Sequence, residues 1–303
     1  MHQVAIGMPV WNGERFVSQA IESLLAQTYG DFELVISDNA STDATADICR
    51  AYASRDPRIR YLRQQRNLGA NANYNAVFGQ SSGRYFKWAA HDDVLAPRFL
   101  EECVRVLDQD EGLVLCSPAT ALINEDGSTV SYSSQHHAMI DSYGAKWPVT
   151  PENNPALASS DPADRFAAVL LNMVMCLEIF GLIRRSALER SSMQPSHVGA
   201  DKVLLAELSL IGPFYLLRDC LFFRRCHPGQ FSRARSGEYR AMWNSGKKGL
   251  TLSHQLQLLT GYLRIGLSAE LTLSQRYRCV SAIWRRAILR EKPVKRLFYA
   301  IVE

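Results

Sequence analysis

The 303-residue sequence lacks the cysteine patterns of disulfide-rich and zinc-binding proteins. Its seven cysteines are scattered and odd in number, without a C-x-x-C pair or a Cys/His cluster at zinc-ligand spacing. We therefore expect reduced thiols. A strong excess of one charge is also missing, because 34 basic residues face 30 acidic ones for a net charge of +4. Such a small surplus gives no reason to expect a nucleic-acid partner.

A secretory leader and an uninterrupted membrane span are absent as well. The opening MHQVAIGMPVWN has no basic region, long apolar stretch or small-residue cleavage site, so we expect a cytoplasmic location. The longest apolar stretch, residues 166–183, contains Asn172 and Glu178. A charge near the centre of a spanning helix costs about 3 kcal/mol, so we expect a buried helix followed by a strand, with a spanning helix as the alternative.

What the first 125 residues do contain is a regular alternation of two patterns. Short apolar runs typical of strands occupy residues 3–10, 32–37, 59–64, 85–90 and 112–123. Between them, apolar residues recur at helical spacing in residues 15–28, 43–53, 70–80 and 97–109. This β-α-β order predicts an α/β fold with a Rossmann-like, mostly parallel central sheet flanked by helices.

The second half is less regular. Residues 125–163 are polar and without a period, which predicts a long irregular loop or lid. From residue 164 we expect a helix, a strand at 178–186, a helix from 199, and two strands at 214–219 and 221–226. Residues 237–303 have a basic and helical pattern. The chain therefore divides into 1–124, 125–163, 164–236 and a C-terminal helical extension.

Polar residues follow each of the first four predicted strands. They are Asn12, Asp38, Asn67 and the pair Asp92-Asp93. Because ligands of such sheets bind beyond the carboxyl ends of the strands, these side chains are candidates for a binding site. Asp38 suits hydrogen bonds from a ribose or pyrimidine, but the same residue before STDAT also fits a turn or helix cap.

The Asp92-Asp93 pair suits a metal site. Carboxylates are the ligands that Mg²⁺ or Mn²⁺ shares with phosphate oxygens and water, and such an ion neutralises a leaving diphosphate. The alternative is a turn and cap ahead of Pro97. A glycosidase pair is disfavoured, because its carboxyls must flank one bond, whereas neighbours on an extended chain point to opposite sides.

Two long segments resemble the family-2 glycosyltransferases, which are inverting enzymes of the GT-A fold. They are MPVWNGERFVSQAIESLLAQTYGDFELVISDNASTDAT and RNLGANANYNAVFGQSSGRYFKWAAHDDVLAPRFLEE. GLIRRSAL, GADKVLLAELSLIGPF and RRCHPGQFSR resemble the family more loosely. The resemblance is strong over the first 110 residues and moderate to residue 233. It implies a GT-A-type domain at 1–236, with 1–124 as the nucleotide-sugar-binding half and 164–236 as the acceptor half.

The resemblance also implies an activity. The expected enzyme moves a sugar from a nucleotide-diphosphate donor to a saccharide or lipid-linked acceptor, with inversion, in cell-surface polysaccharide biosynthesis. The implied nucleotide pocket is lined by Pro9, Val10, Asn12 and Glu14. Asp38 contacts the base or ribose, and the residues near the nucleotide and donor sugar are Asn67, Gly69 and Asn71.

Asp92 matches the last acid of the family's D-x-D motif, with Asp93 beside it, which implies Mg²⁺ or Mn²⁺ as cofactor. The sequence departs from the commoner pattern at Ala90, where an Asp is usual, and this leaves metal dependence open. His227 is a further candidate near the metal or diphosphate, although a His beside Pro-Gly also fits an ordinary loop. The implied positive charge comes from Arg224, Arg225 or Arg233.

Asp201, in GADKVLLAEL, matches the family's catalytic base, which would deprotonate the acceptor hydroxyl. The alternative is an ordinary helix N-cap, and Glu178 is the second candidate for the base. Trp147, in the 125–163 segment, is a candidate for stacking on a base or sugar, although a large aromatic is more often part of a core.

Residues 276–296 form a basic amphipathic pattern, with eight Lys and Arg residues against Glu291 alone. The pattern predicts peripheral contact with the inner face of an anionic membrane, or equally a solvated or partner-binding face on a packed helix.

We considered three rival functions. Ala90 favours an inactive nucleotide-sugar-binding scaffold. The sugar-nucleotide pyrophosphorylases resemble a different pattern, with a glycine-rich basic loop after the first strand. The segment PVWNGERF at this place is not such a loop. A Rossmann oxidoreductase would need the motif G-x-G-x-x-G after the first strand, and this sequence lacks it there.

Overall fold

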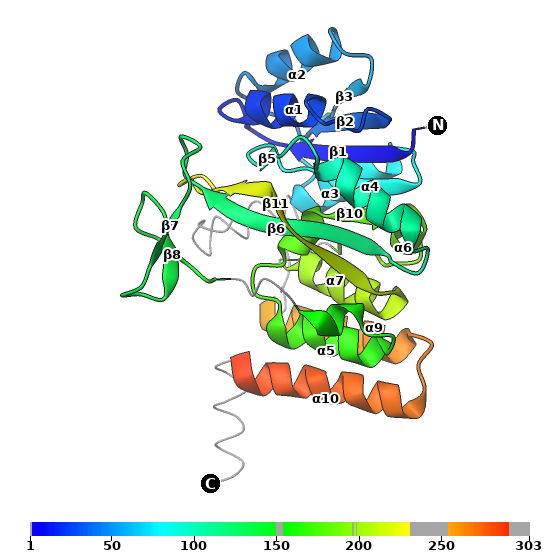
Figure 1. The fold of residues 1–303 in the computed structure, drawn as a ribbon. Coiled ribbons are helices and arrows are strands. Elements are labelled where there is room, and N and C mark those ends of the chain that lie inside the picture. The colour runs from blue at the N-terminus through cyan, green and yellow to red at the C-terminus, as the bar shows by residue number, and fades with distance from the viewer. Residues whose placement is uncertain (1, 150–153, 196, 198, 231–253, 291–303) are drawn as a thin grey trace.

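The chain folds around an eight-stranded sheet with the order β3-β2-β1-β4-β10-β6-β11-β5 (Figure 1). The computed structural model describes residues 2–149, 154–195, 197, 199–230 and 254–290. The strands of this sheet are β1 (Val4–Val10), β2 (Phe32–Asp38), β3 (Ile59–Arg63), β4 (Tyr85–Trp88), β5 (Val94–Leu95), β6 (Leu115–Ile123), β10 (Leu182–Arg184) and β11 (Phe214–Arg225).

Most strand pairs are parallel, as the sequence predicted. β1 pairs with β2 and β4 in parallel, and β2–β3 and β6–β11 are parallel as well. β10 is antiparallel to both β4 and β6, and β5 is antiparallel to β11. All seven residues of β1 are buried, which is the pattern of a parallel strand covered on both faces.

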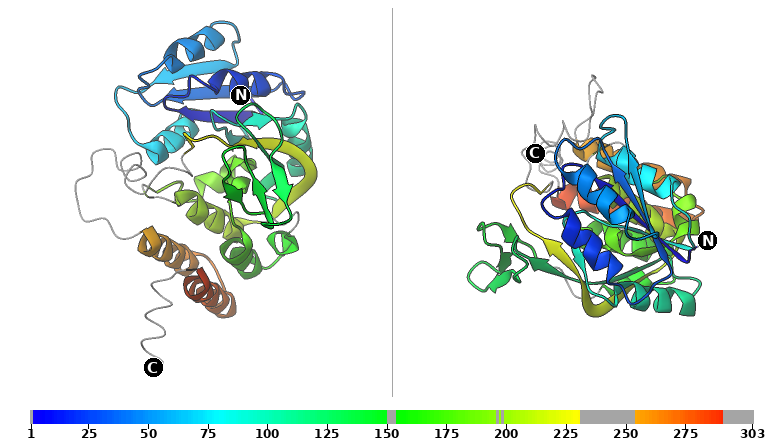
Figure 2. Two further views of the ribbon diagram at one scale, coloured as in Figure 1. Left: turned by 90° about the vertical axis from the view of Figure 1, so that its left-hand side faces the viewer. Right: turned by 90° about the horizontal axis from the view of Figure 1, so that it is seen from above.

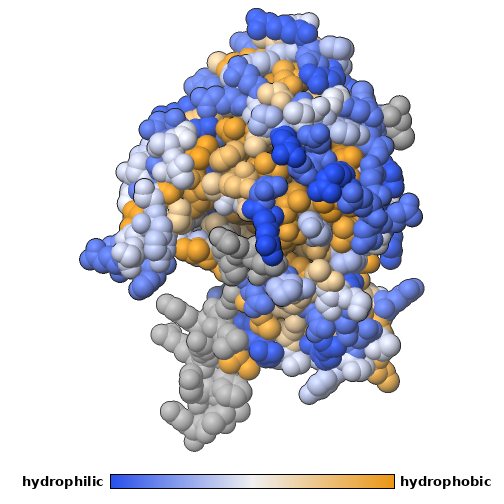
Figure 3. All heavy atoms as spheres, viewed as in Figure 1, coloured by the Kyte–Doolittle hydropathy of each residue, from blue (hydrophilic) through white to orange (hydrophobic). Residues whose placement is uncertain are grey.

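Helices cover both faces of the sheet. They are α1 (Val17–Leu25), α2 (Thr45–Ala53), α3 (Ala70–Gly79), α4 (Phe99–Gln109), α5 (Pro162–Asn172), α6 (Arg185–Glu189) and α7 (Ala200–Ile211), with 3₁₀ helices η1 (Pro155–Ala158) and η2 (Leu177–Phe180). Alternate residues of β1 enter different cores: Ile6 packs on the α1 and α4 side, whereas Ala5 packs on the α5 and α7 side. Figure 3 shows apolar residues gathered over the middle of the face on which β6 and β11 run.

The strands of the second half differ from the prediction. The strand predicted at 178–186 is only β10, three residues long, because η2 occupies residues 177–180. The two strands predicted at 214–219 and 221–226 are one strand, β11, with register shifts around Cys220. A β-bulge interrupts the apolar alternation without ending the strand, which explains why the sequence suggested two.

The segment at 125–163 is more regular than the predicted loop, and its role as a lid stays a prediction. The segment contains β7 (Ser131–Ser133), β8 (Ala138–Ile140) and β9 (Lys146–Trp147), which form a small antiparallel sheet. Asp141 organises the β8–β9 turn, because its carboxylate accepts hydrogen bonds from the backbone N–H of Tyr143 and Ala145. Asp141 also accepts a 2.7 Å hydrogen bond from Trp147 Nε1. Trp147 is buried against Leu122 and Val130, which fits the core alternative for this residue.

Two C-terminal helices, α9 (His254–Ser268) and α10 (Leu273–Arg290), lie at the opposite end of the molecule from α2 (Figures 1 and 2). Tyr262 of α9 and Ile283 of α10 are buried in the same core as α5 and α7. The division predicted at residue 237 falls in the 231–253 segment, outside the described residues. No helix of the described part is long and apolar enough to cross a membrane, and residues 166–183 form α5, η2 and the start of β10.

Several basic residues of α10 hold the helix in place. Arg278 donates a 2.6 Å hydrogen bond to Asp161 and forms an ion pair with Asp164. Arg286 is buried and donates to the carbonyl of Leu170. The outer side of α10 exposes Leu273, Tyr277, Trp284 and Arg285, and residues 291–303 lie outside the described part. Membrane contact through residues 276–296 therefore stays a prediction.

Candidate functional site

The polar residues that follow β1 to β4 meet at one edge of the sheet, because these strands are parallel. Asn39 links two of the loops. Its Nδ2 donates to Asn67 Oδ1 at 2.9 Å, and its Oδ1 accepts from the backbone N–H of Leu68 at 2.8 Å. The loops after β2 and β3 therefore form one hydrogen-bonded rim.

The loop after β1 is fastened to the loop that leads into α2. Pro9 and Val10 are buried at the end of β1. Asn12, with a left-handed φ of 50°, accepts from the backbone N–H of Thr42 at 2.8 Å, and Glu14 accepts from that of Ala44 at 2.9 Å. Both residues are exposed at the rim. These contacts show how the loop is shaped, and the nucleotide contacts of the four residues stay predictions.

Asp38 is wholly buried, and both of its carboxylate oxygens have partners inside the protein. Oδ1 accepts from the backbone N–H of Ser41 at 2.8 Å, and Oδ2 accepts from Tyr61 Oη at 2.7 Å. Arg63 Nη1 lies 3.9 Å from Oδ2. This arrangement fits the turn-shaping alternative for Asp38, and contact with a base or ribose stays a prediction.

Residues 67–71 join the two halves of the domain. Gly69 has a φ of 85°, which favours glycine, and its N–H donates to Asn67 Oδ1 at 2.8 Å at the start of α3. Asn71 is buried, and its Nδ2 donates to the carbonyls of Pro195 and, at 2.9 Å, His197. Asn71 therefore holds the segment that precedes α7.

Asp92 and His227 come together although they lie far apart in the sequence. Asp92 Oδ2 and His227 Nε2 are 3.0 Å apart, and their side chains are 16% and 10% exposed. Burial by itself would raise the pKa of Asp92, but the charge of His91 and the hydrogen bond and charge of His227 lower it below its ordinary value. Asp92 is therefore an ionised, partly accessible carboxylate at neutral pH.

Asp93 has a different environment. It is buried, and its Oδ1 accepts a 2.9 Å hydrogen bond from the backbone N–H of Arg225. Burial, and then the charge of Asp92, raise the pKa of Asp93 to about 8. The hydrogen bond from the Arg225 backbone favours a positioning role for Asp93, and its role as a metal ligand stays a prediction.

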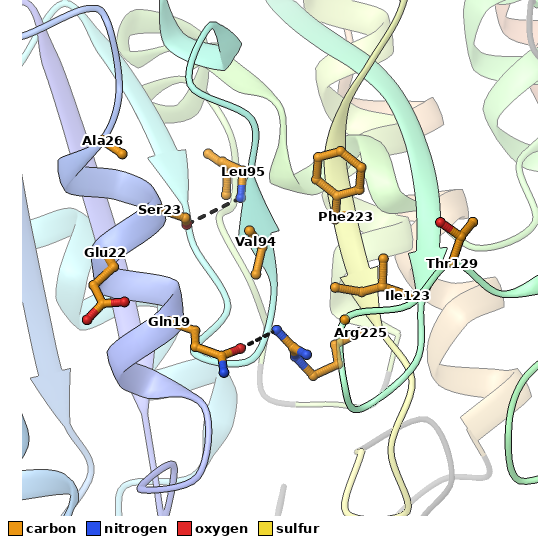
Figure 4. Close-up of a pocket in the computed structure, with 11 residues that line it drawn as sticks. Gln19, Glu22, Ser23, Ala26, Val94, Leu95, Ile123, Thr129, Phe223 and Arg225 are labelled. Carbon is orange, nitrogen blue, oxygen red and sulfur yellow. Dashed lines mark hydrogen bonds between the residues drawn. The ribbon is translucent and has the colours of Figure 1, made fainter.

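Arg225 connects the Asp92-Asp93 loop to three other segments. Its side chain is 2% exposed, its Nε donates to the Asp92 carbonyl at 2.9 Å, and its Nη1 donates to the Glu125 carbonyl at 2.8 Å. Figure 4 shows Arg225 reaching toward Gln19 of α1, to which Nη2 donates at 2.7 Å beside a cavity of about 560 Å³. The guanidinium is thus engaged inside the protein.

The other two arginines considered for the diphosphate differ from Arg225. Arg224 lies over the ring of Trp147, 4.9 Å from its centroid, and Arg233 lies outside the described residues.

A divalent ion fits this edge only as an ion shared with a ligand. Within the described residues, no group of three or more His, Cys, Asp and Glu side chains could hold a metal. Asp92 and His227 offer one oxygen and one nitrogen donor, and Ala90 offers none. Mg²⁺ is commonly held by one or two carboxylates plus substrate phosphates and water, so this small donor set is compatible with such an ion.

Asp201 lies in the first turn of α7, and the N-cap position is Gly199, with a φ of 75°. The alternative of Asp201 as the N-cap is therefore wrong. Burial, and then the charges of Asp92, Asp93 and Asp201, raise the pKa of Tyr74. Tyr74 of α3 is half-buried, and its phenol responds to both the metal-site candidates and the candidate base, a role that the sequence did not indicate.

Comparisons with known proteins agree with this architecture. A family model described as "Glycosyl transferase family 2" matches residues 5–190, more than half of the chain. An uncharacterized glycosyltransferase of Rickettsia felis is 33% identical over 132 residues, covering 43% of this chain and 21% of that protein. Glycosyltransferase GlyA of Streptococcus pneumoniae is 31% identical over 99 residues, covering 33% of this chain and 14% of that protein. The matches thus span only 21% and 14% of the lengths of these two relatives.

Solved structures share the fold at low identity. S. aureus TarS 1–349 in complex with UDP has a TM-score of 0.68 and 14% identity, covering 96% of this chain and 73% of that one. Mannosyltransferase PcManGT from Pyrobaculum calidifontis, in complex with GDP-Man and Mn²⁺, has a TM-score of 0.55 and 15% identity, covering 99% and 79%.

Proposed function

The chain belongs to glycosyl transferase family 2, and from this premise we propose that it transfers a sugar from a nucleotide-diphosphate donor to a saccharide or lipid-linked acceptor with inversion. The observation that carries the proposal is the pairing of Asp92 with His227 at the carboxyl edge of the parallel strands. The solved neighbours, which hold UDP, UDP-GlcNAc or GDP-Man with Mn²⁺, support a nucleotide-sugar donor.

In this proposal the loops after β1, β2 and β3 frame the nucleotide. Asp92 and His227 would hold Mg²⁺ or Mn²⁺, and the ion would offset the charge that develops on the leaving diphosphate. Arg225 and Asp93 keep the Asp92 loop in position through their hydrogen bonds. Residues 1–124 then form the donor half and residues 164–236 the acceptor half.

Asp201 is the proposed base. The acceptor hydroxyl passes its proton to the Asp201 carboxylate while its oxygen bonds to the anomeric carbon. The bond from that carbon to the nucleotide diphosphate breaks on the opposite side, so the configuration inverts and the nucleotide leaves with the bonding electrons. Asn71 supports this step by holding the segment in front of α7. A role in cell-surface polysaccharide biosynthesis at the cytoplasmic face of the membrane rests on the family resemblance.

Nucleotide-dependent thermal stabilisation tests the donor site. The purified protein is melted with UDP, GDP, dTDP or CDP, each with and without Mn²⁺, and the series is repeated with Asp92→Ala. Asp108→Ala is the matched control, because Asp108 is a half-exposed carboxylate that pairs with Arg84. We expect one nucleotide to stabilise the wild type and the control only with the metal, and Asp92→Ala to lose the shift.

Turnover distinguishes the enzyme from the rival scaffold. Asp201→Asn keeps the size of the side chain and removes its basicity, so we expect donor binding to persist and transfer to fall by about 10²-fold or more. Unchanged transfer in this variant, or the absence of a nucleotide shift in the wild type, would contradict the proposal.

A further inference from the structure

A second cavity, of about 750 Å³, lies beside the proposed acceptor half. Its walls come from β6, β11, residues 172–178 and Leu157 of η1, together with Met139 of β8, Pro148 and Val149. Apolar side chains dominate, including Met139, Met173 and Met175. Methionine is flexible and polarizable, so such a wall adapts to an aliphatic chain better than to the hydroxyl groups of a bare sugar.

One carboxyl group lies in this apolar wall. Glu178 belongs to η2, and its Oε2 is buried without a hydrogen-bond partner among the described residues. Burial raises the pKa of Glu178, which favours the neutral acid, a hydrogen-bond donor. A buried polar group without a partner costs about 1–3 kcal/mol, so a ligand that accepts a hydrogen bond here removes a penalty of the free protein.

The turn that presents Glu178 is unusual. Cys176, which precedes η2, has a φ of 54°, a left-handed conformation that is rare for residues other than glycine and asparagine. Such backbone conformations are often found at binding sites, where the surrounding structure maintains them. The strain and the unpartnered carboxyl thus occur in the same short segment.

The cavity adjoins the proposed base. η2 packs against α7, whose first turn carries Asp201. Cys176 lines the cavity and is the residue from which η2 begins. The cavity wall formed by η2 therefore lies against the helix that carries the proposed base.

We propose that this cavity binds an aliphatic chain attached to the acceptor saccharide, with Glu178 donating a hydrogen bond to an acceptor oxygen. This inference rests on the proposed glycosyl transfer and selects the lipid-linked acceptor over the free saccharide. The apolar wall supplies affinity in proportion to the chain area that it removes from water. Glu178 fixes where the chain ends and the sugar begins.

Binding of two glucosides tests the chain site without turnover. The dissociation constants of n-hexyl β-D-glucopyranoside and methyl β-D-glucopyranoside are measured by calorimetry, below the micelle concentration of the former. We expect the hexyl compound to bind at least about tenfold more tightly, since each buried CH₂ contributes about 0.8 kcal/mol and tenfold needs about 1.4 kcal/mol.

Substitutions locate the binding. Val174 lines the cavity and is 38% exposed, so Val174→Asp should fold, and we expect it to abolish the preference for the hexyl chain. Leu267→Asp is the matched control on α9, where the leucine is 50% exposed and does not line the cavity, and it should behave as wild type. Glu178→Leu should weaken both glucosides about fivefold, whereas Glu178→Gln, which keeps a donor, should bind as wild type.

Each outcome has one meaning. Equal affinities for the two glucosides, or a hexyl preference that survives in Val174→Asp, overturn the inference even when the nucleotide shift is present. A hexyl preference that Val174→Asp removes, in a protein that no nucleotide stabilises, supports the chain site and contradicts the proposed donor chemistry.

Discussion

Arg225 offers the sharpest test of how the site is held together. Three of its hydrogen bonds are shorter than 3.0 Å, to the carbonyls of Asp92 and Glu125 and to Gln19 Oε1. In Arg225→Met the two carbonyls lose a charged donor, and each such loss costs about 1.5–3 kcal/mol. Gln19 is exposed and can turn to water. After allowance for the apolar contacts of Met, we expect the free energy of unfolding to fall by about 3–5 kcal/mol.

Urea unfolding measures this loss, and Arg105→Met is the control. Arg105 also makes hydrogen bonds, to Glu102 and Gln109, but its side chain is 50% exposed. Exposed ion pairs contribute about 0–1 kcal/mol, so the control should lose no more than that. A loss below about 1 kcal/mol in Arg225→Met, equal to the control, would refute the view that Arg225 holds four segments together.

Arg225→Lys separates positioning from stability. Lysine keeps the charge but cannot reach several carbonyls with a rigid fork. We expect a folded protein in which the metal-dependent nucleotide affinity falls by about tenfold, because the Asp92 loop loses its anchor. Normal nucleotide affinity in this variant would show that the Asp92 loop keeps its position without Arg225.

Three further substitutions follow from the packing. Burial lowers the pKa of Lys87 from 10.5 to about 7, so between these pH values the unfolded chain binds more protons than the folded one. The free energy of unfolding of the wild type therefore rises with pH across this window, as the cost of burying the charged lysine disappears. Lys87→Met should therefore exceed wild type in urea stability near pH 6 and lose that advantage by pH 10; equal differences at both pH values would contradict this. In Gly13→Ala the new Cβ would lie 2.6 Å from His91 Cδ2, so we expect urea unfolding to show about 1–3 kcal/mol lower stability, with a smaller nucleotide shift. Wild-type stability in this variant would show that the His91 ring moves aside. Asn71→Asp would place a carboxylate against two backbone carbonyls, and we expect thermal unfolding to show a loss of about 2–4 kcal/mol; unchanged melting would mean that the segment before α7 does not depend on this contact.

The parallel half of the sheet was predictable because its signals are local. Most strands of residues 3–90 are apolar runs, α1 and α4 have a clear helical periodicity, and Asn12 and Asp92 follow strands within four residues. The second half was less predictable. The bulge near Cys220 divides one apolar run into two. The small sheet of residues 131–147 depends on hydrogen bonds that Asp141 accepts rather than on a period.

The adjacent arginines 224 and 225 show the limit for side chains. Neighbours on a strand face opposite sides, so the sequence alone indicates that one of the two points inward, but not which. Arg225 is the inward one because carbonyls from Asp92 and Glu125 converge on it. The roles of Asp93 and Asn71 as positioning residues are likewise set by partners more than 100 residues away.

The sequence by itself determined the fold class, the family and the edge of the sheet at which the polar residues gather. These depend on periodicity and on the alternation of strands and helices along the chain, which are properties of neighbouring residues. Only the tertiary structure decided that Asp92 pairs with His227, that Asp93 and Arg225 face inward, and that Glu178 lies in an apolar cavity. The physical reason is that a side chain's charge state and hydrogen bonds depend on what surrounds it in space, and most of those surroundings come from distant parts of the chain.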